Sequence, residues 1–314
     1  MTSPSSSVSG IYWKESLIDG QPAKIRCVDV DKQTYVINRG PVSVAGLEDD
    51  WYEDVHDPYA VINALSNYQG LKLDVFTFLQ RLPDLKPKYD FHVEFESVAA
   101  LAITTYDHWW SKQVKGTTRN MVRKSQKAGV QTREVAYDDE FVRGMVKIFS
   151  ESPMRQGRRF WHYGKDFETV KEQFSRYIFR EEMIGAYYQG ELIGFVMLGD
   201  AGHFGVVGQI ISMLKHRDKA TNNALLAKTV EVSERKKLPY LVYGYWCDSS
   251  LVDFKRYSGF QEARMPRYFV ALTEKGRLAL KLGAHRGWKA MIPEGLKRKF
   301  KHWRSRWYAM KKTE

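Results

Sequence analysis

Apolar and polar residues follow first a β-type and then a helical pattern in the middle of the chain. Apolar runs at 184–188 and 192–198 flank a short polar break around Gly190, which is typical of a β-hairpin. A third apolar run at 204–214 ends in a polar loop at 215–223. Beyond the loop, the apolar positions form one stripe on a helix. The pattern predicts three antiparallel strands, a loop and a helix, with the loop at a helix N-terminus where backbone N–H groups receive anions.

The same periodicities predict further elements on both sides of this stretch. Those before it are strands at 24–30, 34–38, 73–79 and 91–95, an acidic and aromatic loop at 48–59, and a helix at 59–65. A helix at 117–128 is expected to start at Thr117 or Thr118 as N-cap and to stop at Gly129. The remaining elements are a strand at 130–136, helices at 138–150 (capped by Asp138) and 166–179, strands at 239–246 and 260–272, and a helix at 248–257 capped by Asp248 or Ser249. From residue 130 the predicted order is therefore β-α-α-β-β-β-α-β-α-β.

Composition indicates a globular protein of two lobes. The chain has 314 residues, 43% of them hydrophobic and 14% aromatic, and no apolar run reaches the roughly 18 residues of a membrane span. The first ten residues lack the charged and apolar regions of a signal peptide and indicate a short disordered tail. Cys27 and Cys247 alone suggest neither a disulfide framework nor a zinc site, which fits a reducing cytoplasm.

Positive charge is concentrated at the C-terminus. Residues 276–314 contain twelve Lys or Arg against Glu294 and Glu314, a net charge of +10, which leaves +2 of the total of +12 for the first 275 residues. Six apolar residues there share one face of a predicted helix: Ile292, Leu296, Phe300, Trp303, Trp307 and Met310. Three interpretations stay open for this segment: an interfacial helix on an anionic membrane, a basic arm for tRNA or another polyanion, and a helix packed on the body with a solvated outer face.

The predicted element order over 130–272 resembles the GNAT acyltransferase fold. The sequence Phe254-Lys255 followed by Gly259-Phe260 resembles the FK-x-x-x-G-F signature of FemAB-like transferases, and the basic helix at 119–130 resembles the helix that opens their second lobe. The resemblance implies an α+β fold with a mixed sheet. It divides the chain into a tail at 1–10, a degenerate N-terminal GNAT-like lobe at 11–115, a GNAT-like acyltransferase domain at 116–275 and a basic amphipathic segment at 276–314.

The resemblance also implies the reaction: transfer of an acyl or aminoacyl group to an amine, in cell-envelope or glycan metabolism. Acyl-CoA-dependent GNAT enzymes usually carry a glycine-rich Arg-Gly-x-Gly-x-Gly/Ala loop at the exit of the third strand. This chain matches that pattern at Arg217 but has Asp218, Ala220 and Asn222 where small residues are expected. Asp218 places a negative charge beside the expected pyrophosphate. Aminoacyl-tRNA is therefore favoured over acyl-CoA as co-substrate, and no tightly bound cofactor is expected.

Candidate site residues fall into three groups. For catalysis we expect Lys255 to stabilise the oxyanion, with Tyr245 and Asp248 at a strand exit where Asp248 holds or deprotonates an ammonium. The donor-binding candidates are Gln209, Ser212, Arg217, Asn222 and Asn223. The acceptor-binding candidates are Arg119, Arg123, Arg155, Arg158, Arg159, Trp161, His162 and Tyr163, the last six in a loop dense in arginine and aromatic residues.

A structural role competes with each of these assignments. Lys255 would then be an exposed lysine on a short helix, Asp248 a plain N-cap, Trp161 a cover for the core, and the basic helix face merely solvated. No Ser-His-Asp spacing, metal-ligand cluster or phosphate-binding Walker loop is present. The expected partners are a small-molecule, glycan or peptide amine, tRNA, and an anionic membrane surface through 292–310. The expected location is cytoplasmic, peripheral to the inner face of the membrane. A non-catalytic protein that binds polyanions or membranes with a GNAT-like fold is the alternative.

Overall fold

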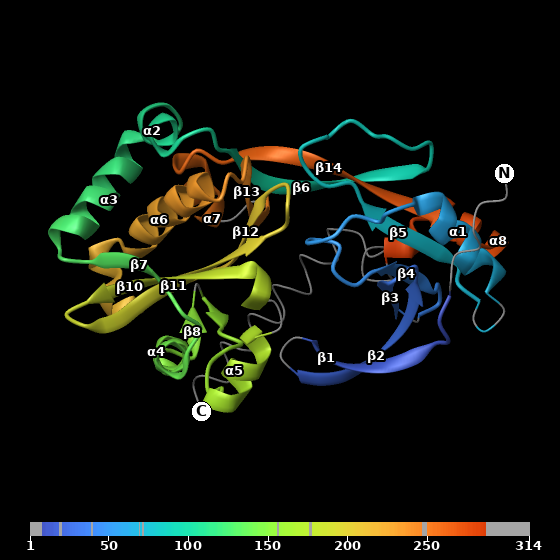
Figure 1. The fold of residues 1–314 in the computed structure, drawn as a ribbon, viewed down its shortest axis with the longest axis horizontal. Coiled ribbons are helices and arrows are strands. Elements are labelled where there is room, and N and C mark those ends of the chain that lie inside the picture. The colour runs from blue at the N-terminus through green and yellow to red at the C-terminus, as the bar shows by residue number, and fades with distance from the viewer. Residues whose placement is uncertain are drawn as a thin grey trace.

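One mixed sheet runs through the whole molecule (Figure 1). The computed structural model describes residues 8–18, 21–38, 40–68, 70, 72–155, 157–175, 178–246 and 250–286, without the side chains of 17, 18, 21, 22, 158 and 250. Within these ranges the sheet has twelve strands in the order β1-β2-β3-β4-β5-β14-β6-β13-β12-β11-β10-β7. A separate two-stranded ribbon is formed by β8 (Met154–Arg155) and β9 (Arg158–Arg159).

The N-terminal half of the chain supplies six strands of the sheet. They are β1 (Tyr12–Ile18), β2 (Gln21–Val30), β3 (Gln33–Asn38), β4 (Val44–Leu47), β5 (Val75–Leu79) and β6 (His92–Ala102). The helix α1 (Pro58–Asn67) joins β4 to its parallel neighbour β5, and Asp57 caps it by accepting from the amides of Tyr59 and Ala60. The linking region to the second half contains α2 (Tyr106–His108), the π-helix η1 (Trp109–Gln113) and α3 (Gly116–Lys127).

The C-terminal half supplies the other six strands. They are β7 (Gln131–Val135), β10 (Glu181–Tyr188), β11 (Glu191–Asp200), β12 (Gly205–Ser212), β13 (Tyr240–Tyr245) and β14 (Gln261–Ala271). Its helical elements are α4 (Asp139–Ser150), α5 (Phe167–Ser175), η2 (Ile178–Arg180), η3 (Leu214–Lys219), α6 (Thr221–Arg235), α7 (Ser250–Tyr257), α8 (Glu274–Lys281) and η4 (Ala284–Arg286). The helix α6 joins β12 to its parallel neighbour β13, as α1 joins β4 to β5.

The two halves exchange their last strands. Read from either edge, the sheet shows three antiparallel pairings, one parallel pairing and one antiparallel pairing before the central β14–β6 pair. Strand β6 follows β5 in the chain but pairs with β13, whereas β14 follows β13 but pairs with β5. A third core cluster, which includes Leu79, Phe204 and Met265, lies between the cores of the two halves. The predicted N-terminal lobe and acyltransferase domain thus share one sheet.

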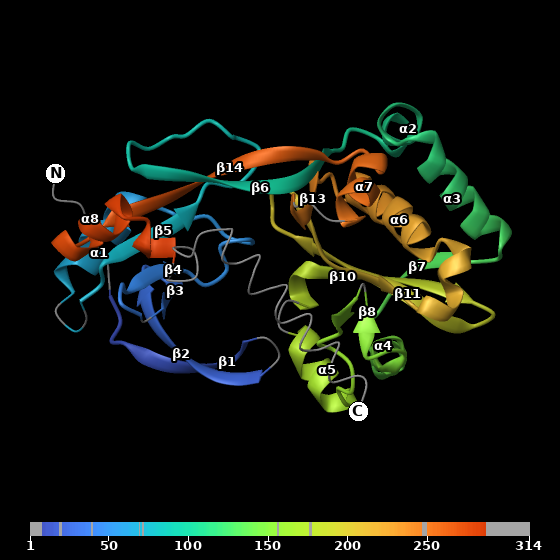
Figure 2. The same ribbon diagram turned by 180° about the vertical axis from the view of Figure 1, so that it is seen from behind.

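The first half is the simpler copy. Its β2 follows β1 with two residues between them in the sequence, whereas α4, β8, β9, α5 and η2 stand between β7 and β10 in the second half. In the second half, α3 and α6 cover one face of the sheet and α4 and α5 the other (Figures 1 and 2). Phe195 of β11 packs on Phe141 and Phe149 of α4, whereas a Cβ at the adjacent Gly194 would meet Thr221 of α6.

Most predicted elements are confirmed, with several corrections. The predicted strand at 91–95 extends as β6 to Ala102, and the helix predicted at 166–179 ends at Ser175. Asp138 caps α4 as predicted, and Gly129 ends α3 with φ +83°. The predicted caps Thr117 and Thr118 are wrong, because α3 begins at Gly116 after Lys115 without a side-chain cap.

Some predictions lie outside the described residues. These are the caps Asp248 and Ser249, the basic helix at 292–310 and residues 1–7 of the predicted tail. Within the described part of that tail, Val8 bridges to Val30 and the Ser9 amide donates to the Asp29 carbonyl.

Candidate active site

The second half opens where its two parallel strands separate. The strands β12 and β13 pair only through Gly205–Leu241 and Val206–Val242. Beyond these pairs β12 continues beside β11 and β13 continues beside β6, so the facing edges of β12 and β13 leave each other. Backbone N–H and C=O groups on separated edges need other partners. We call this split between β12 and β13 the notch.

A β-bulge marks β12 at the notch. Met197 pairs with Gln209 and Leu198 pairs with Val207, so Gly208 is an extra residue opposite β11. A bulge bends its strand and re-aims the neighbouring side chains. Gly208 is exposed and carries no side chain, so its backbone is accessible to solvent at this point of the notch.

A loop from the first half closes the notch on one side. The pocket between them has a volume of about 340 Å³. It is lined by Glu48, Asp49, Asp50, Trp51, Tyr52, Val206, Val207, Gly208 and Gly244. Trp51 also meets the half-exposed Tyr245 at the end of β13, with ring centroids 5.8 Å apart in an edge-on arrangement. The lining is therefore acidic and aromatic on one wall and made of valines and glycines on the other.

Three arginines hold this loop in place. Each forms an ion pair with an acidic residue of 50–54, and each comes from a different strand or helix end. The pairs are Arg267–Asp50 at 2.7 Å, Arg180–Glu53 at 2.6 Å and Arg81–Asp54 at 2.7 Å. Arg81 is buried and also donates to the carbonyl of Ala201, in the turn between β11 and β12. The loop is consequently tied to the second half as well as to its own half.

Glu181 is a carboxyl at the notch whose pKa is strongly raised. It begins β10, and the Tyr52 hydroxyl donates to its Oε1 at 3.5 Å. A Cβ at Gly208 would lie 4.0 Å from the same oxygen. Burial raises the pKa of Glu181 to about 7, and the hydrogen bond from Tyr52 opposes that rise. A carboxyl with this pKa can accept a proton at neutral pH and release it again.

The ring of Tyr52 is itself fixed by a glycine. A Cβ at Gly199 of β11 would come within 2.8 Å of the Tyr52 ring, so only glycine leaves room for it. Burial, and then the charge of Glu181, raise the pKa of the Tyr52 hydroxyl. Tyr52 is consequently a neutral donor at neutral pH.

On the same sheet face, the predicted acceptor loop reaches the next residues of β12. Nε2 of the buried His162 lies 3.5 Å from Nε2 of Gln209, and Arg155 donates to the carbonyl of Ser212 at 2.8 Å. Burial lowers the pKa of His162 to about 3, so the imidazole is neutral. Its ring stacks on Phe149 at 4.4 Å. The structure thus brings the donor candidates Gln209 and Ser212 against the acceptor candidates His162 and Arg155.

Lys255 is buried, which corrects the interpretation of an exposed lysine. Its side chain reaches back from α7, so the ammonium donates to the carbonyl of Tyr245 at 2.8 Å and lies 4.7 Å from the Tyr243 ring centroid. Phe254 and Phe260 contact the same Tyr243 ring edge-on. The FK-x-x-x-G-F residues therefore build one cluster beneath the end of β13.

Gly259 completes that motif for two reasons. Its φ of +92° favours glycine, and a Cβ there would stand 3.2 Å from the Cβ of Gln113. The neighbouring Ser258 carbonyl accepts from the indole of the buried Trp109 at 2.9 Å. The turn after α7 is thus locked to the linking region.

The loop after β12 already holds an anionic group. Both oxygens of Glu151 accept backbone hydrogen bonds there, from the amide of Leu214 at 2.6 Å and that of Lys215 at 2.8 Å. Arg217 and Asp218 are exposed in η3, and Asn222 and Asn223 lie in the first turn of α6. A negative ligand at the amides of 214 and 215 would have to displace the Glu151 carboxylate.

The remaining predicted residues do not converge on the notch. Arg119 donates to the carbonyls of Trp110 and Val114, and Arg123 is exposed on α3, across the sheet from His162. Arg159, Trp161 and Tyr163 are exposed in or beside β9. The Arg158 side chain and Asp248 lie outside the description.

Sequence reasoning missed Glu181, Tyr52 and the arginines that hold the covering loop. The acidic and aromatic composition of 48–59 was the available signal, but it could not indicate contact with a strand more than 120 residues away. Glu181 stands at the start of an apolar strand and has no local mark of function.

No protein-family model and no curated protein matches this sequence. Solved structures do match the fold. The C-terminal DUF2156 domain of a protein named as a lysylphosphatidylglycerol synthetase, from Agrobacterium fabrum, superposes with a TM-score of 0.53 at 12% identity, over 79% of this chain and 84% of that one. FemX superposes with a TM-score of 0.50 at 10% identity, over 86% and 90%. L-PGS from Bacillus licheniformis gives 0.51 at 13% identity, over 76% and 81%.

These similarities, together with the strand order, show a GNAT-like fold of the FemAB-like kind. They confirm the predicted α+β fold class with its mixed sheet. Among the helices that the structure describes, none has both the length and the apolar character needed to cross a bilayer.

Proposed function

We propose that this protein is an N-acyltransferase that moves an acyl or aminoacyl group from a carrier to an amine, in cell-envelope or glycan metabolism. The observation that carries the proposal is the notch: separated parallel strands, a bulge at Gly208, and a nearby partly buried carboxyl, Glu181, with a pKa of about 7. Acyl transfer to an amine needs a place for two substrates and a base for the amine proton. One of the similar structures is named as a lysylphosphatidylglycerol synthetase, a name that supports transfer of an aminoacyl group.

The acidic wall of the pocket suits the amine. An aliphatic amine is an ammonium at neutral pH, and the pocket wall carries three carboxylates at 48–50, of which Glu48 is paired with Lys14 and Asp50 with Arg267. Glu181 accepts a proton from the ammonium or from the attacking amine. The amine nitrogen then bonds to the carbonyl carbon of the donor. The bond from that carbon to the carrier oxygen or sulfur breaks, and the carrier takes up the proton that the attacking amine has lost and leaves as the alcohol or thiol. Lys255, a buried cation at the end of β13, is our candidate for stabilising the oxyanion.

The preferred donor in this proposal is an aminoacyl-tRNA rather than acyl-CoA. Glu151 occupies the amides of 214 and 215 at the exit of β12, and Asp218 adds a further negative charge. Both features oppose a pyrophosphate in that loop. An aminoacyl ester presents only its acyl group to the notch and leaves its polyanion for a surface outside it.

The test is a transfer assay with matched variants. The wild-type protein, Glu181→Gln and the neighbouring Glu182→Gln are incubated with acetyl-CoA or with charged total tRNA, and with lysine-containing peptides or amino sugars. Mass spectrometry detects the amide product. We expect transfer that increases as pH rises through about 7, the pKa of Glu181. Glu181→Gln should lower the rate by about 10²- to 10⁴-fold, the usual contribution of a general base.

Equal rates in the wild-type protein and in Glu181→Gln would contradict the role of Glu181 as the general base. A folded protein that transfers nothing from any donor, yet binds tRNA or anionic vesicles, would support the non-catalytic alternative. Mass spectrometry of small molecules that copurify with the protein would narrow the donor and acceptor before the assay.

A further inference from the structure

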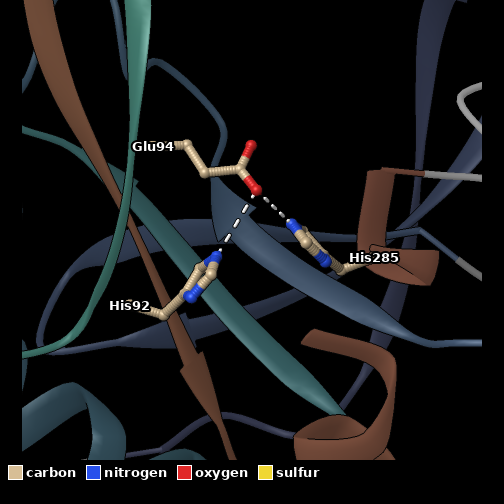
Figure 3. Close-up of side chains that lie close together, drawn as sticks. All are labelled: His92, Glu94 and His285. Atoms are coloured by element: carbon tan, nitrogen blue, oxygen red, sulfur yellow. Dashed lines mark hydrogen bonds and ion pairs between the residues drawn. The ribbon is translucent and has the colours of Figure 1, made fainter. Parts of the chain in front are cut away.

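Two histidines and a glutamate meet at the start of β6 (Figure 3). His92 and Glu94 lie two residues apart on β6, and His285 reaches them from η4. Figure 3 shows both imidazoles directed at the same carboxylate. The Nε2 atoms of His285 and His92 lie 2.7 Å and 3.4 Å from Oε1 of Glu94. One ligand atom from each residue falls within a group whose members all lie within 4.8 Å of one another.

We propose that His92, Glu94 and His285 bind one divalent transition-metal ion of the zinc type. Two imidazole nitrogens and one carboxylate oxygen are a usual protein ligand set for zinc, at about 2.0–2.2 Å from the ion. Ligand atoms at such distances in a tetrahedral arrangement stand about 3.3 Å apart. The separations of 2.7 Å and 3.4 Å from the Glu94 oxygen bracket that value, and the two imidazole nitrogens lie within 4.8 Å of each other, so binding requires the two imidazoles to approach each other.

His285 can adopt the tautomer that a metal requires. Its Nε2 lies 2.7 Å from a carboxylate oxygen of Glu94, which only accepts, so Nε2 carries a proton when no ion is bound. A metal ion would replace that proton on the His285 ring. The His285 side chain is buried, and Nδ1 faces the carbonyl oxygen of Ala279 in α8 at 3.4 Å. A proton on Nδ1 directed at this carbonyl leaves Nε2 with the lone pair that a metal needs. Backbone carbonyls commonly orient metal-binding histidines in this way.

Arg286 is the competing group. Its Nε donates to Oε1 of Glu94 at 2.9 Å and to Oε2 at 3.0 Å, so the cluster without an ion is a charge-paired network. A metal on Oε1 leaves Oε2 for the guanidinium. Arg286 then remains as an outer contact, and its positive charge weakens the attraction of the site for a cation.

The site is separate from the notch and does not rest on the proposed function. The part of β6 that pairs with β13 lies at Val98–Ala102. At the other end of β6, His92 pairs with Phe269 and Glu94 with Arg267 of β14. A bound ion would join the exchanged strand β6 to η4, across about 190 residues of sequence. It would fix η4 to the central sheet.

Calorimetry with zinc chloride tests this proposal on the full-length, untagged protein after chelator treatment and buffer exchange. We expect one site per chain with a dissociation constant at or below the low micromolar range. His92→Ala should weaken binding at least tenfold, and His285→Asn similarly. Arg286→Gln should tighten it, because a competing positive charge is removed. His108→Ala, an exposed histidine on α2, is the matched control and should bind as the wild type does.

A cobalt titration and thermal melts give independent readouts. Cobalt bound by two imidazoles and a carboxylate should develop visible absorption that His92→Ala loses. Zinc should raise the melting temperature of the wild type and not that of His92→Ala, since a ligand that binds only the folded state stabilises it. His92 is exposed, so its variant remains informative even if the buried His285 variant fails to fold. Absence of stoichiometric binding, or equal affinity in wild type and His92→Ala, would overturn the proposal.

Discussion

Replacing Glu181 by glutamine should change how the stability of this protein depends on pH. Burial raises the pKa of Glu181 from an ordinary 4.5 to about 7 in the folded protein. The folded state therefore binds this proton more tightly than the unfolded state does. The resulting stability is fully present below pH 4.5 and is lost as pH rises through about 7. Glutamine cannot ionise, so the stability of the Glu181→Gln variant does not fall in this way as pH rises.

The size of the effect follows from the two pKa values. At about 1.4 kcal/mol per pH unit, the interval from 4.5 to about 7 corresponds to about 3 kcal/mol in the free energy of unfolding. Glu181 retains some contact with solvent, which reduces this figure. Between pH 5 and pH 8 we expect the stability of Glu181→Gln to gain about 2 kcal/mol relative to the wild type.

Urea unfolding at pH 5, 6, 7 and 8, followed by tryptophan fluorescence, measures the difference. With a slope of about 3 kcal/mol per M, a gain of about 2 kcal/mol shifts the relative midpoint by roughly 0.7 M. Glu182→Gln serves as the control. Glu182 is the next residue of β10, and its carboxylate accepts a hydrogen bond from Lys236. The other titrating groups are the same in the wild type and in Glu181→Gln, so their contributions cancel in the difference between the two proteins. A difference between Glu181→Gln and wild type that stays constant from pH 5 to pH 8 would refute the reasoning.

Three further predictions address the donor, Lys255 and the C-terminal segment. Calorimetry should show acetyl-CoA and CoA binding weakly or not at all, because Glu151 holds the amides of 214 and 215, and low-micromolar binding would restore an ordinary acyl-CoA site. Lys255→Ala should reduce transfer and destabilise the fold by about 1–3 kcal/mol, because the buried ammonium no longer serves the Tyr245 carbonyl, and undiminished transfer would remove its catalytic role. Deleting 291–314 should abolish vesicle co-sedimentation with an unchanged melting temperature if the segment is an interfacial helix. If the apolar stripe packs on the body, the deletion should instead lower the melting temperature or cause aggregation, and the full-length chain should not bind vesicles.

Local sequence signals were sufficient for most of the elements but not for their assembly. The strands β10 to β12 were predicted because apolar runs and glycine-bearing breaks are local features. The exchange of β6 and β14 could not be predicted, because strand pairing across about 170 residues leaves no local mark. The predicted strand at 91–95 was too short for a related reason: the tertiary partner β13 extends β6 to Ala102.

The prediction found the site residues on strand β12. It missed those that come together from separate parts of the chain, Tyr52 and Glu181. Gln209 and Ser212 do contact His162 and Arg155. The prediction assigned both segments to the acyltransferase domain, and in the structure both belong to the second half. Arg119 and Arg123 were grouped with them only by charge. Sequence does not state which face of a sheet a helix covers, and α3 lies on the face opposite to α4.

The exchange of strands gives the first half a role in the candidate site. In each half a loop leaves the strand that precedes the parallel partner: 48–57 follows β4, and 213–220 follows β12. In the second half this loop is the place of the expected donor. In the first half it reaches over the notch of the second half and is held there by Arg81, Arg180 and Arg267. The first half lacks helices between its first two strands, but it keeps the two features that the notch uses, this loop and the exchanged strand β6 beside β13. The first half therefore provides one wall of the pocket at the notch.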